Sequence, residues 1–308
     1  MDSPFYIEAP PNKKKIHFEK FSHKNWDFYA HVEYMLPSKI MDELTSTSEY
    51  IKIKQLPEIL NGYNRLYLIN KENNFAYEFS PLQILDLTDY ELRQKAFENK
   101  LIYYIPPEVK VQFHEDWKNI KIEGREDIKR QNPTSDWTFS SPSLGNVCTI
   151  SKSEISSFYK NENFSDNDKV FKNEIDDNVN IPFEKLSPQN PIIHYNEVIF
   201  YEDELGDNGI SESKIRFRIM DDCFYGLMRS YLRVDNVLIR NMDTRIFHNF
   251  GDDYIIRYFT VKEMSYMDLK KQGFNFSNEW NISPYQSDQV DQYMKNPIFS
   301  VKDKLFIK

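Results

Sequence analysis

The chain has 308 residues, of which 40% are hydrophobic and 15% aromatic, so it can bury one sizeable core. Its formal net charge is −9 and its one purely basic run is Lys13–Lys15, which argues against nucleic-acid binding because that function needs a basic surface. The sequence lacks an N-terminal apolar signal region and any run of roughly 18 apolar residues, so we expect neither secretion nor a membrane span.

Metal and cofactor motifs are missing from the sequence. The two cysteines, Cys148 and Cys223, are far apart and stand in no metal-binding spacing, so two reduced thiols are favoured over a disulfide. The 6 histidines form no HxxxH, HExxH or HxH pattern, and the 8 glycines form no phosphate-binding loop. We therefore expect no metal, no cofactor, and a protein of the cytoplasm with the nucleus as a second location.

The N-terminal part of the chain predicts a polar tail followed by strands. Residues 1–24 are polar and form the expected tail. Trp26–Glu33 alternates apolar and polar side chains, which is typical of a half-buried strand. Leu66–Ile69 and Phe75–Phe79 flank the polar segment Asn70–Asn74 and predict a hairpin.

A helical stretch and an insertion are predicted next. Ser80-Pro81 is a helix-start signal with Pro at the first helical position, and apolar residues then recur at helical spacing as far as Asn99. Residues 151–180 are polar, acidic and rich in Asn, with no sustained period, so we expect a flexible insertion there.

The richest strand signal lies in the last third of the chain. Four segments predict strands: Glu197–Leu205, Lys214–Met220, Val237–Arg240 and Tyr254–Thr260. Turn residues at Asp235-Asn236 predict a hairpin over residues 229–246, whereas periodicity does not decide whether Cys223–Leu232 is helix or strand. Neighbouring strands without regular βαβ alternation predict an α+β fold, a single domain of mainly antiparallel sheets packed as a two-layer core with a few flanking helices.

The acidic run Glu202–Glu204 is the candidate for acid–base chemistry. On a strand, Glu202 and Glu204 point to one face, and together with His194 they make a candidate hydrolase site. The alternative is a solvated strand end whose carboxylates pair with Arg216 or Arg218 across a hairpin. We favour the alternative because surface charges far outnumber catalytic ones and no nucleophile motif accompanies the run.

Several arginines lie in otherwise apolar C-terminal strands, where an unpaired buried charge is costly: Arg229, Arg233, Arg240 and Arg245. If residues 237–246 form a regular strand, Asn241, Asp243 and Arg245 share one face, and Arg240 lies on the other with Met242 and Thr244. An Asp–Arg pair here either orders the sheet or lines a groove that binds a peptide through its carboxylates. Residue chemistry leaves these two interpretations evenly balanced.

The same C-terminal block carries a family resemblance. LRVDNVLIRNMDTRIFHNF (Leu232–Phe250) resembles the signature of the TIPRL family, the TOR-signalling-pathway regulator-like or TIP-forty-one-like proteins. Further segments resemble family segments in the same order: Leu56–Leu68 (LPEILNGYNRLYL), Ser135–Ser141 (SDWTFSS) and Glu197–Ser211 (EVIFYEDELGDNGIS). The resemblance is specific because separated motifs agree in both order and chemistry.

The resemblance implies a fold, a function and a domain division. It implies a single α+β domain over residues 25–265 with a peptide-binding groove, which leaves residues 266–308 as a C-terminal extension. It implies a non-catalytic regulator in TOR signalling that binds the catalytic subunits of type 2A, 4 and 6 serine/threonine protein phosphatases, whose C-terminal tail enters the groove. We expect a monomer.

The resemblance also implies phosphatase-contact positions. Ile181 and Asp243 match the family at these positions, whereas Asn241 replaces a Met and Gln83 replaces an Asp. We hypothesise that Arg240 or Arg245 donates to the carboxylates of the tail. On this interpretation Asp243→Asn weakens phosphatase binding and leaves thermal stability nearly unchanged. The rival functions are a hydrolase that uses Glu202, Glu204 and His194, and a structural scaffold that binds an unrelated acidic partner.

Overall fold

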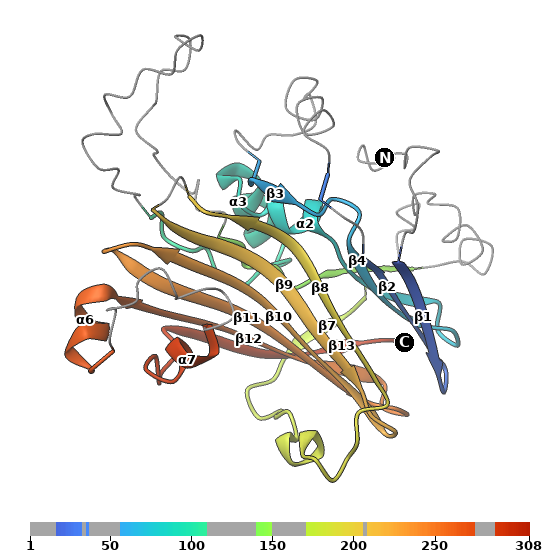
Figure 1. Cartoon of the computed structure of the whole chain (residues 1–308). Helices are drawn as coiled ribbons and strands as arrows, with labels where there is room; N and C mark the ends of the chain where they lie inside the picture. Colours follow the sequence, from blue (N-terminus) through green and yellow to red (C-terminus); the bar gives the residue numbers. More distant parts are fainter. Residues whose placement is uncertain are drawn as a thin grey trace.

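Figure 1 shows a computed structural model of the chain, which describes residues 17–32, 35–36, 56–109, 140–149, 171–205, 208–274 and 287–308. Within them, two antiparallel sheets share one hydrophobic core and few helices accompany them, which confirms the expected fold class. The smaller sheet has the strand order β1-β2-β4-β5-β6, and the larger has the order β3-β8-β9-β10-β11-β12-β13-β7.

The five-stranded sheet is built from short strands: β1 (His17–His23), β2 (Trp26–Val32), β4 (Arg65–Asn70), β5 (Phe75–Phe79) and β6 (Asn146–Thr149). The predicted hairpin is confirmed, because β4 pairs with β5. Strand β2 is more buried than its alternation predicts, since even Asp27 is covered. Its carboxylate is tolerated there because Lys20 and Lys71 lie at 3.2 and 3.1 Å from it.

The eight-stranded sheet contains longer strands: β3 (Ile59–Leu60), β7 (Asn173–Ile175), β8 (His194–Asp203), β9 (Gly209–Ile219), β10 (Cys223–Val234), β11 (Leu238–Asn249), β12 (Tyr254–Ser265) and β13 (Phe299–Phe306). The four predicted strands all lie within this sheet, and Cys223–Leu232 is strand rather than helix. Strands β10 and β11 form the predicted hairpin. Its turn places Asn236 at a φ of 60°, a conformation that Asn tolerates better than most residues.

The helices of the described residues are short: α2 (Pro81–Asp86), α3 (Tyr90–Glu98), α6 (Tyr266–Lys271), α7 (Ser287–Asp291) and the 3₁₀ turn η2 (Phe183–Leu186). The predicted helix start at Ser80-Pro81 is confirmed. The helical stretch is broken before Tyr90, however, because the Thr88 hydroxyl donates to the carbonyl of Leu85 and Asp89 caps a new helix.

The segments that we expected to be a polar tail, a flexible insertion and a C-terminal extension each contain a strand of one of the two sheets. The polar tail contains β1, the expected insertion contains β7, and the expected C-terminal extension contains α6, α7 and β13. Phe171, also in the expected insertion, packs edge-on against Phe75 at a ring-centroid distance of 4.9 Å. The strands β1 and β7 each pair at one edge of a sheet, and β13 pairs between β12 and β7, which the local composition of these segments does not reveal. Residues 1–16, 135–139 and 151–170 lie outside the described part of the chain.

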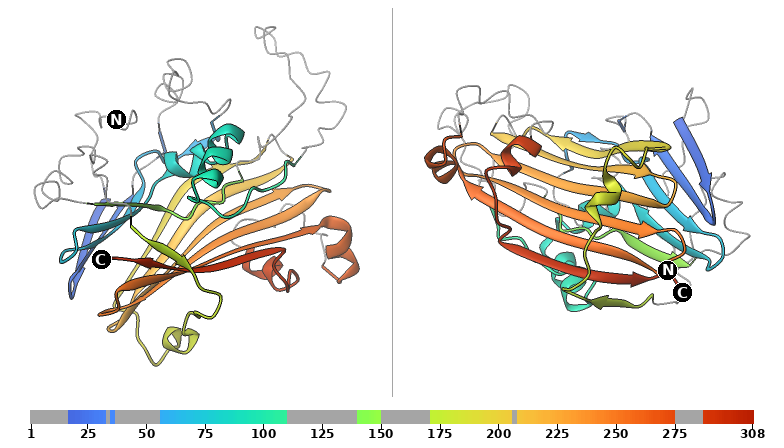
Figure 2. Two further views of the ribbon diagram at one scale, coloured as in Figure 1. Left: turned by 180° about the vertical axis from the view of Figure 1, so that it is seen from behind. Right: turned by 90° about the horizontal axis from the view of Figure 1, so that it is seen from below.

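The two faces of the eight-stranded sheet differ. We call the face packed on the five-stranded sheet the inner face, and it carries apolar side chains such as Phe217, Phe224 and Ile246. The opposite, outer face carries η2, α6 and α7 (Figure 2). No helix in the described segments has the length and apolar character needed to cross a membrane.

Candidate functional site

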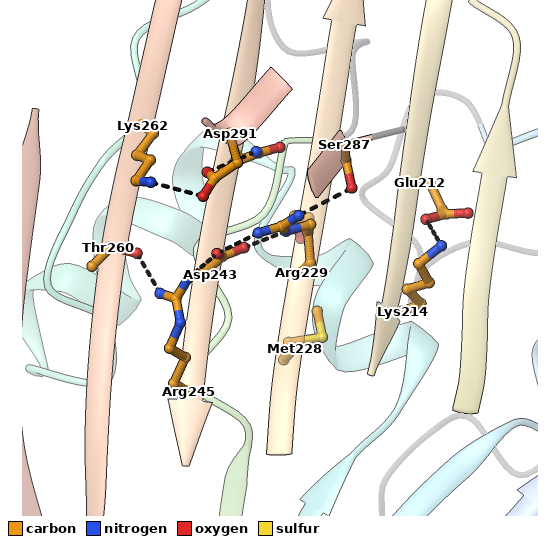
Figure 3. Close-up of polar contacts among 12 residues, drawn as sticks. Glu212, Lys214, Met228, Arg229, Asp243, Arg245, Thr260, Lys262, Ser287 and Asp291 are labelled. Atoms are coloured by element: carbon orange, nitrogen blue, oxygen red, sulfur yellow. Dashed lines mark hydrogen bonds and ion pairs between the residues drawn. The ribbon is translucent and has the colours of Figure 1, made fainter. Parts of the chain in front are cut away.

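A cluster of charged side chains lies at the middle of the outer face (Figure 3). Arg229 of β10 and Asp243 of β11 are direct cross-strand partners, and the guanidinium donates from Nε to Oδ1 and from Nη2 to Oδ2, each at 2.7 Å. Arg245 donates from Nη2 to Asp243 Oδ2 at 2.6 Å and from Nη1 to the hydroxyl of Thr260 at 2.9 Å. Two guanidinium groups therefore share one carboxylate. We call these three charged residues the ion-pair centre.

The ion-pair centre is largely removed from water. Asp243 is 1% exposed and Arg229 is 5% exposed. Burial by itself raises the pKa of the Asp243 carboxyl, but Arg229 and Arg245 outweigh it and hold that pKa below its usual value. Because two positive charges meet one negative charge, the centre keeps an excess of positive charge that suits an acidic ligand.

A second charged pair lies beside the ion-pair centre on β9. The Lys214 ammonium and the Glu212 carboxylate are 2.7 Å apart, and both are buried. Glu212 also faces Glu202 of β8 as its cross-strand partner. Burial raises the pKa of Glu212 to about 7, with Lys214 opposing the shift and Glu202 adding to it.

Aromatic rings and cations line the outer face toward η2. The Arg218 guanidinium lies 5.1 Å from the ring centroid of Tyr225, and the Arg245 guanidinium lies 5.9 Å from that of Tyr258. The Lys302 ammonium also approaches Tyr258, at 5.5 Å. Rings and cations in this arrangement can take up the apolar and acidic side chains of a peptide.

The structure divides the predicted site residues between the two faces. Asn241, Asp243 and Arg245 share the outer face, as the alternation of β11 predicts. Ile181, just before η2, packs on the same face against Phe247, which is two residues beyond Arg245 on that face. These residues therefore form one continuous strip.

Arg240 and Gln83 do not belong to this strip. Arg240 is 0% exposed, and its Nε, Nη1 and Nη2 donate to Glu263, to the Ser140 hydroxyl and to the carbonyl of Pro107. Arg240 therefore ties other segments to the inner side of β11 rather than offering donors to a partner. Gln83 lies on α2, whose apolar residues Ile84 and Leu85 belong to the core between the sheets.

The burial of Asp243 changes its expected effect on stability. We expected Asp243→Asn to leave thermal stability nearly unchanged, but the carboxylate neutralises the buried Arg229. Removing one partner of a buried ion pair leaves an uncompensated charge, which costs about 3–5 kcal/mol. Asp243 is therefore a structural member of the sheet as well as a candidate contact.

The candidate hydrolase residues are not brought together. His194 begins β8 and Glu202 stands near its end, which separates them by about 26 Å at roughly 3.3 Å per residue. His194 instead stacks on Phe21 at 4.4 Å and lies 3.6 Å from Glu19. Among the described residues, no group of three or more His, Cys, Asp or Glu side chains is placed to hold a metal ion.

The expected ion pairs of the acidic run are also wrong. The register of β8 and β9 pairs Arg216 with Glu197, whose carboxylate lies 2.9 Å from its Nε. Asp203 is buried and accepts the backbone N–H groups of Glu58 and Leu205 at 2.9 and 2.6 Å. Burial raises its pKa to about 6 despite these hydrogen bonds. The run therefore anchors the chain near β3.

Sequence reasoning missed the contacts that α7 makes with the outer face: Ser287 with Arg229 of the ion-pair centre, and Asp291 with Asn241 and Lys262. Ser287 and Asp291 contact the outer face, although neither was a candidate. No local signal marks them, because Ser287 is 58 residues from Arg229 along the chain. Arg229 itself was noted as an arginine within an apolar strand, which was the one available signal.

Comparisons with known proteins bear on this site. A family profile described as the TIP41-like family matches residues 59–270. The TIP41-like protein of Dictyostelium discoideum is 31% identical over 220 residues, which cover 71% of this chain and 71% of that protein. The TIP41-like protein of Homo sapiens is 27% identical over 278 residues, which cover 88% of each chain. The Saccharomyces cerevisiae protein named type 2A phosphatase activator TIP41 is 27% identical over 247 residues, 80% of this chain and 64% of that protein.

Proposed function

Because the chain belongs to the TIP41-like family, we propose that it is a regulator of type 2A-family serine/threonine protein phosphatases and binds their catalytic subunits. The observation that carries this proposal is the family match, together with the name of the yeast relative as a type 2A phosphatase activator. The proposal extends to the type 4 and type 6 catalytic subunits and to a place in TOR signalling. In it, the chain acts as a monomer in the cytoplasm and the nucleus.

The proposed contact is the strip on the outer face of the eight-stranded sheet. The C-terminal tail of the catalytic subunit lies in this proposal beside Asn241, Asp243 and Arg245 and reaches toward Ile181. The excess positive charge of the ion-pair centre and the rings of Tyr225 and Tyr258 support it, because they suit carboxylates and apolar side chains. Gln83 and Arg240 are not part of this contact.

The proposed role is binding rather than catalysis. The separation of His194 from Glu202 along β8 supports this view, because an acid–base pair must act on the same substrate atoms. In this proposal, binding changes the activity of the phosphatase in one of two ways. The regulator holds the C-terminal tail of the catalytic subunit, or it limits the access of that subunit to the other phosphatase subunits.

The test is a charge placed on the strip without disturbing the core. Leu227 is half-buried on the outer face, between its cross-strand partners Arg216 and Arg245. Leu227→Asp adds a negative charge beside Arg216 and Arg245, which offsets their positive charge and repels an acidic tail. We therefore expect the affinity for a purified type 2A catalytic subunit to fall about tenfold or more. Calorimetric titration measures the affinity, and thermal unfolding measures the fold.

The matched control is Leu101→Asp, which introduces the same change at an exposed leucine that follows α3. It should leave affinity unchanged. Equal affinity of the Leu227→Asp variant and the wild type would move the contact away from the strip. A wild type that binds other acidic proteins and no phosphatase would favour the scaffold function instead.

A further inference from the structure

Helix α7 lies against the ion-pair centre and directs polar side chains at it (Figure 3). Arg229 donates from Nη1 to the Ser287 hydroxyl at 3.0 Å. Asp291, four residues later, accepts from Asn241 Nδ2 at 3.2 Å and from Lys262 Nζ at 2.8 Å. A hydroxyl and a carboxylate one helical turn apart thus meet donors from three adjacent strands.

Apolar side chains hold α7 in this place. Val290 and Met294 are buried and pack in one cluster with Tyr231 of β10 and Ile239 of β11. Leu269 of α6 belongs to the same cluster. Burial of side chains of this size contributes about 1.5–3 kcal/mol each, so a five-residue helix that is too short to be stable alone is kept on the sheet.

The charges of the surface explain why an acidic segment lies there. Arg229, Arg245 and Lys262 carry three positive charges, which Asp243 alone does not balance. Asp291 supplies a second negative charge in the position that an external carboxylate would take. The cationic side chains that bind α7 would therefore bind the carboxylates of an acidic peptide in the same way.

The contacts of α7 overlap with the proposed phosphatase contact. Asn241 donates to Asp291, and Arg229, which holds Asp243, donates to Ser287. The family match ends at residue 270, so α7 comes from a part of the chain that follows the matched region.

We propose that α7 is an intramolecular acidic ligand of the outer face, which a carboxylate-bearing segment of the phosphatase must displace in order to bind. The inference rests on the proposed function, since it describes how that same site is regulated. In the free protein, Ser287, Val290 and Asp291 occupy the site and lower the apparent affinity for the partner. Loosening α7 therefore strengthens partner binding.

The experiment compares the full chain with its Asp291→Asn variant. This substitution removes the charge that Lys262 and Asn241 hold, and the affinity for a purified type 2A catalytic subunit should rise about three- to tenfold. Hydrogen exchange at the amides of residues 287–294 should accelerate in the free variant, and in the wild type when the phosphatase is added, while β10 and β11 stay protected.

The matched control is Asp268→Asn on α6, which removes an exposed carboxylate that pairs with Lys271 and accepts from Ser265. Among the described residues, its hydrogen bonds and ion pairs do not include a residue of the outer-face site. It should leave the affinity unchanged. If Asp291→Asn unfolds the sheet, Val290→Ala is the second variant. It removes part of the apolar contact that holds α7, so affinity for the phosphatase and hydrogen exchange of α7 should both increase.

Three outcomes overturn the inference, and the third is distinguishable from the first two. If the wild type binds the phosphatase and the Asp291→Asn variant binds equally well or more weakly, the inference about α7 is wrong. The proposed function is then still supported. Slower exchange of α7 in the complex has the same meaning. Failure of every variant, wild type included, to bind the phosphatase overturns the proposed function and this inference together.

Discussion

Two buried arginine–aspartate pairs on the two faces of the same sheet have similar geometry and different surroundings. Arg257 of β12 and Asp303 of β13 are cross-strand partners on the inner face, and the guanidinium donates from Nε to Oδ1 at 2.8 Å and from Nη2 to Oδ2. Arg229 and Asp243 make the same double contact on the outer face. The first pair faces the five-stranded sheet, whereas the second faces α7.

The surroundings decide what each pair can do. The hydroxyl of Tyr103 also donates to Asp303, and Tyr77 lies near Arg257, with the pKa of both phenols raised to about 12, chiefly by burial. Burial lowers the pKa of Arg257, but Asp303 outweighs it and raises that pKa above its usual value. This pair is enclosed by the core and holds two strands together. The outer pair borders a removable segment and can change its neighbours.

The largest expected effect is on the inner pair. Asp303→Asn leaves the buried Arg257 guanidinium without its counter-charge, and the free energy of unfolding should fall by about 3–5 kcal/mol. Urea denaturation measures it. The control Asp253→Asn breaks an exposed pair with Lys308 and should have almost no effect. A loss at Asp303 as small as that of the control would contradict a structural role for the inner pair.

The outer pair should show a smaller loss of stability together with a loss of binding. Asp243→Asn replaces the carboxylate that balances the Arg229 charge with a neutral amide, while the Ser287 hydroxyl still accepts from Arg229, so we expect the free energy of unfolding to fall by about 3 kcal/mol. Phosphatase affinity of the folded variant should fall as well, because the carboxylate that orients the guanidinium groups of Arg229 and Arg245 is lost, whereas folded Asp303→Asn should bind normally. Denaturation and calorimetric titration under conditions where both variants are folded separate the two effects. If the Asp243→Asn variant binds the phosphatase as the wild type does, both pairs have only a structural role.

A pH effect on stability is expected from Glu212, in the second charged pair of the outer face. The pKa of Glu212 is raised from its usual 4.5 to about 7, so the folded state holds this proton more tightly than the unfolded chain does. The resulting stability is fully present below pH 4.5 and is lost as the pH rises through 7. Glu212→Gln should therefore remove roughly 2–3 kcal/mol of the fall in unfolding free energy between pH 4.5 and 7.

Asp203, with a pKa raised to about 6, contributes in the same direction, so part of this pH dependence should remain in the Glu212→Gln variant. Asp243 acts with the opposite sign, because its pKa is lowered and its contribution is lost as the pH falls below the usual value of 3.8. Glu197→Gln on β8 is the matched control, since its carboxylate is half-exposed and pairs with Arg216. If the Glu212→Gln variant and the wild type show the same dependence of unfolding free energy on pH, a group other than Glu212 takes up the proton.

The smallest expected effects come from the neutral partners of each pair. Thr260→Val removes the hydroxyl that accepts from Arg245, and Tyr103→Phe removes the hydroxyl that donates to Asp303. Each should lower the free energy of unfolding by about 1 kcal/mol. Urea denaturation of both variants tests whether the two pairs tolerate the loss of a neighbour equally. A loss of more than about 2 kcal/mol at Thr260 would show that the Nη1 group of Arg245 finds no replacement acceptor, although Nη2 still donates to Asp243.

Local patterns predicted much of the fold. The turn at Asp235-Asn236, the polar segment between β4 and β5 and the start of α2 all depend on residues close together in the chain. The alternation of β11 also predicted which of its side chains share a face. These features follow from backbone geometry and nearest-neighbour chemistry, which the sequence carries directly.

The sequence by itself determined the class of the fold, the family signature and the faces of the central hairpin. Only the tertiary structure decided which charges meet: Arg240 is enclosed by Ser140 and Pro107, Arg257 joins Asp303, and Asp291 joins Lys262. It also placed β1, β7 and β13 in the sheets. These partners are distant along the chain, and strand order and register bring them together. No local period encodes that order, so burial and pairing of the charges emerge only in the folded chain.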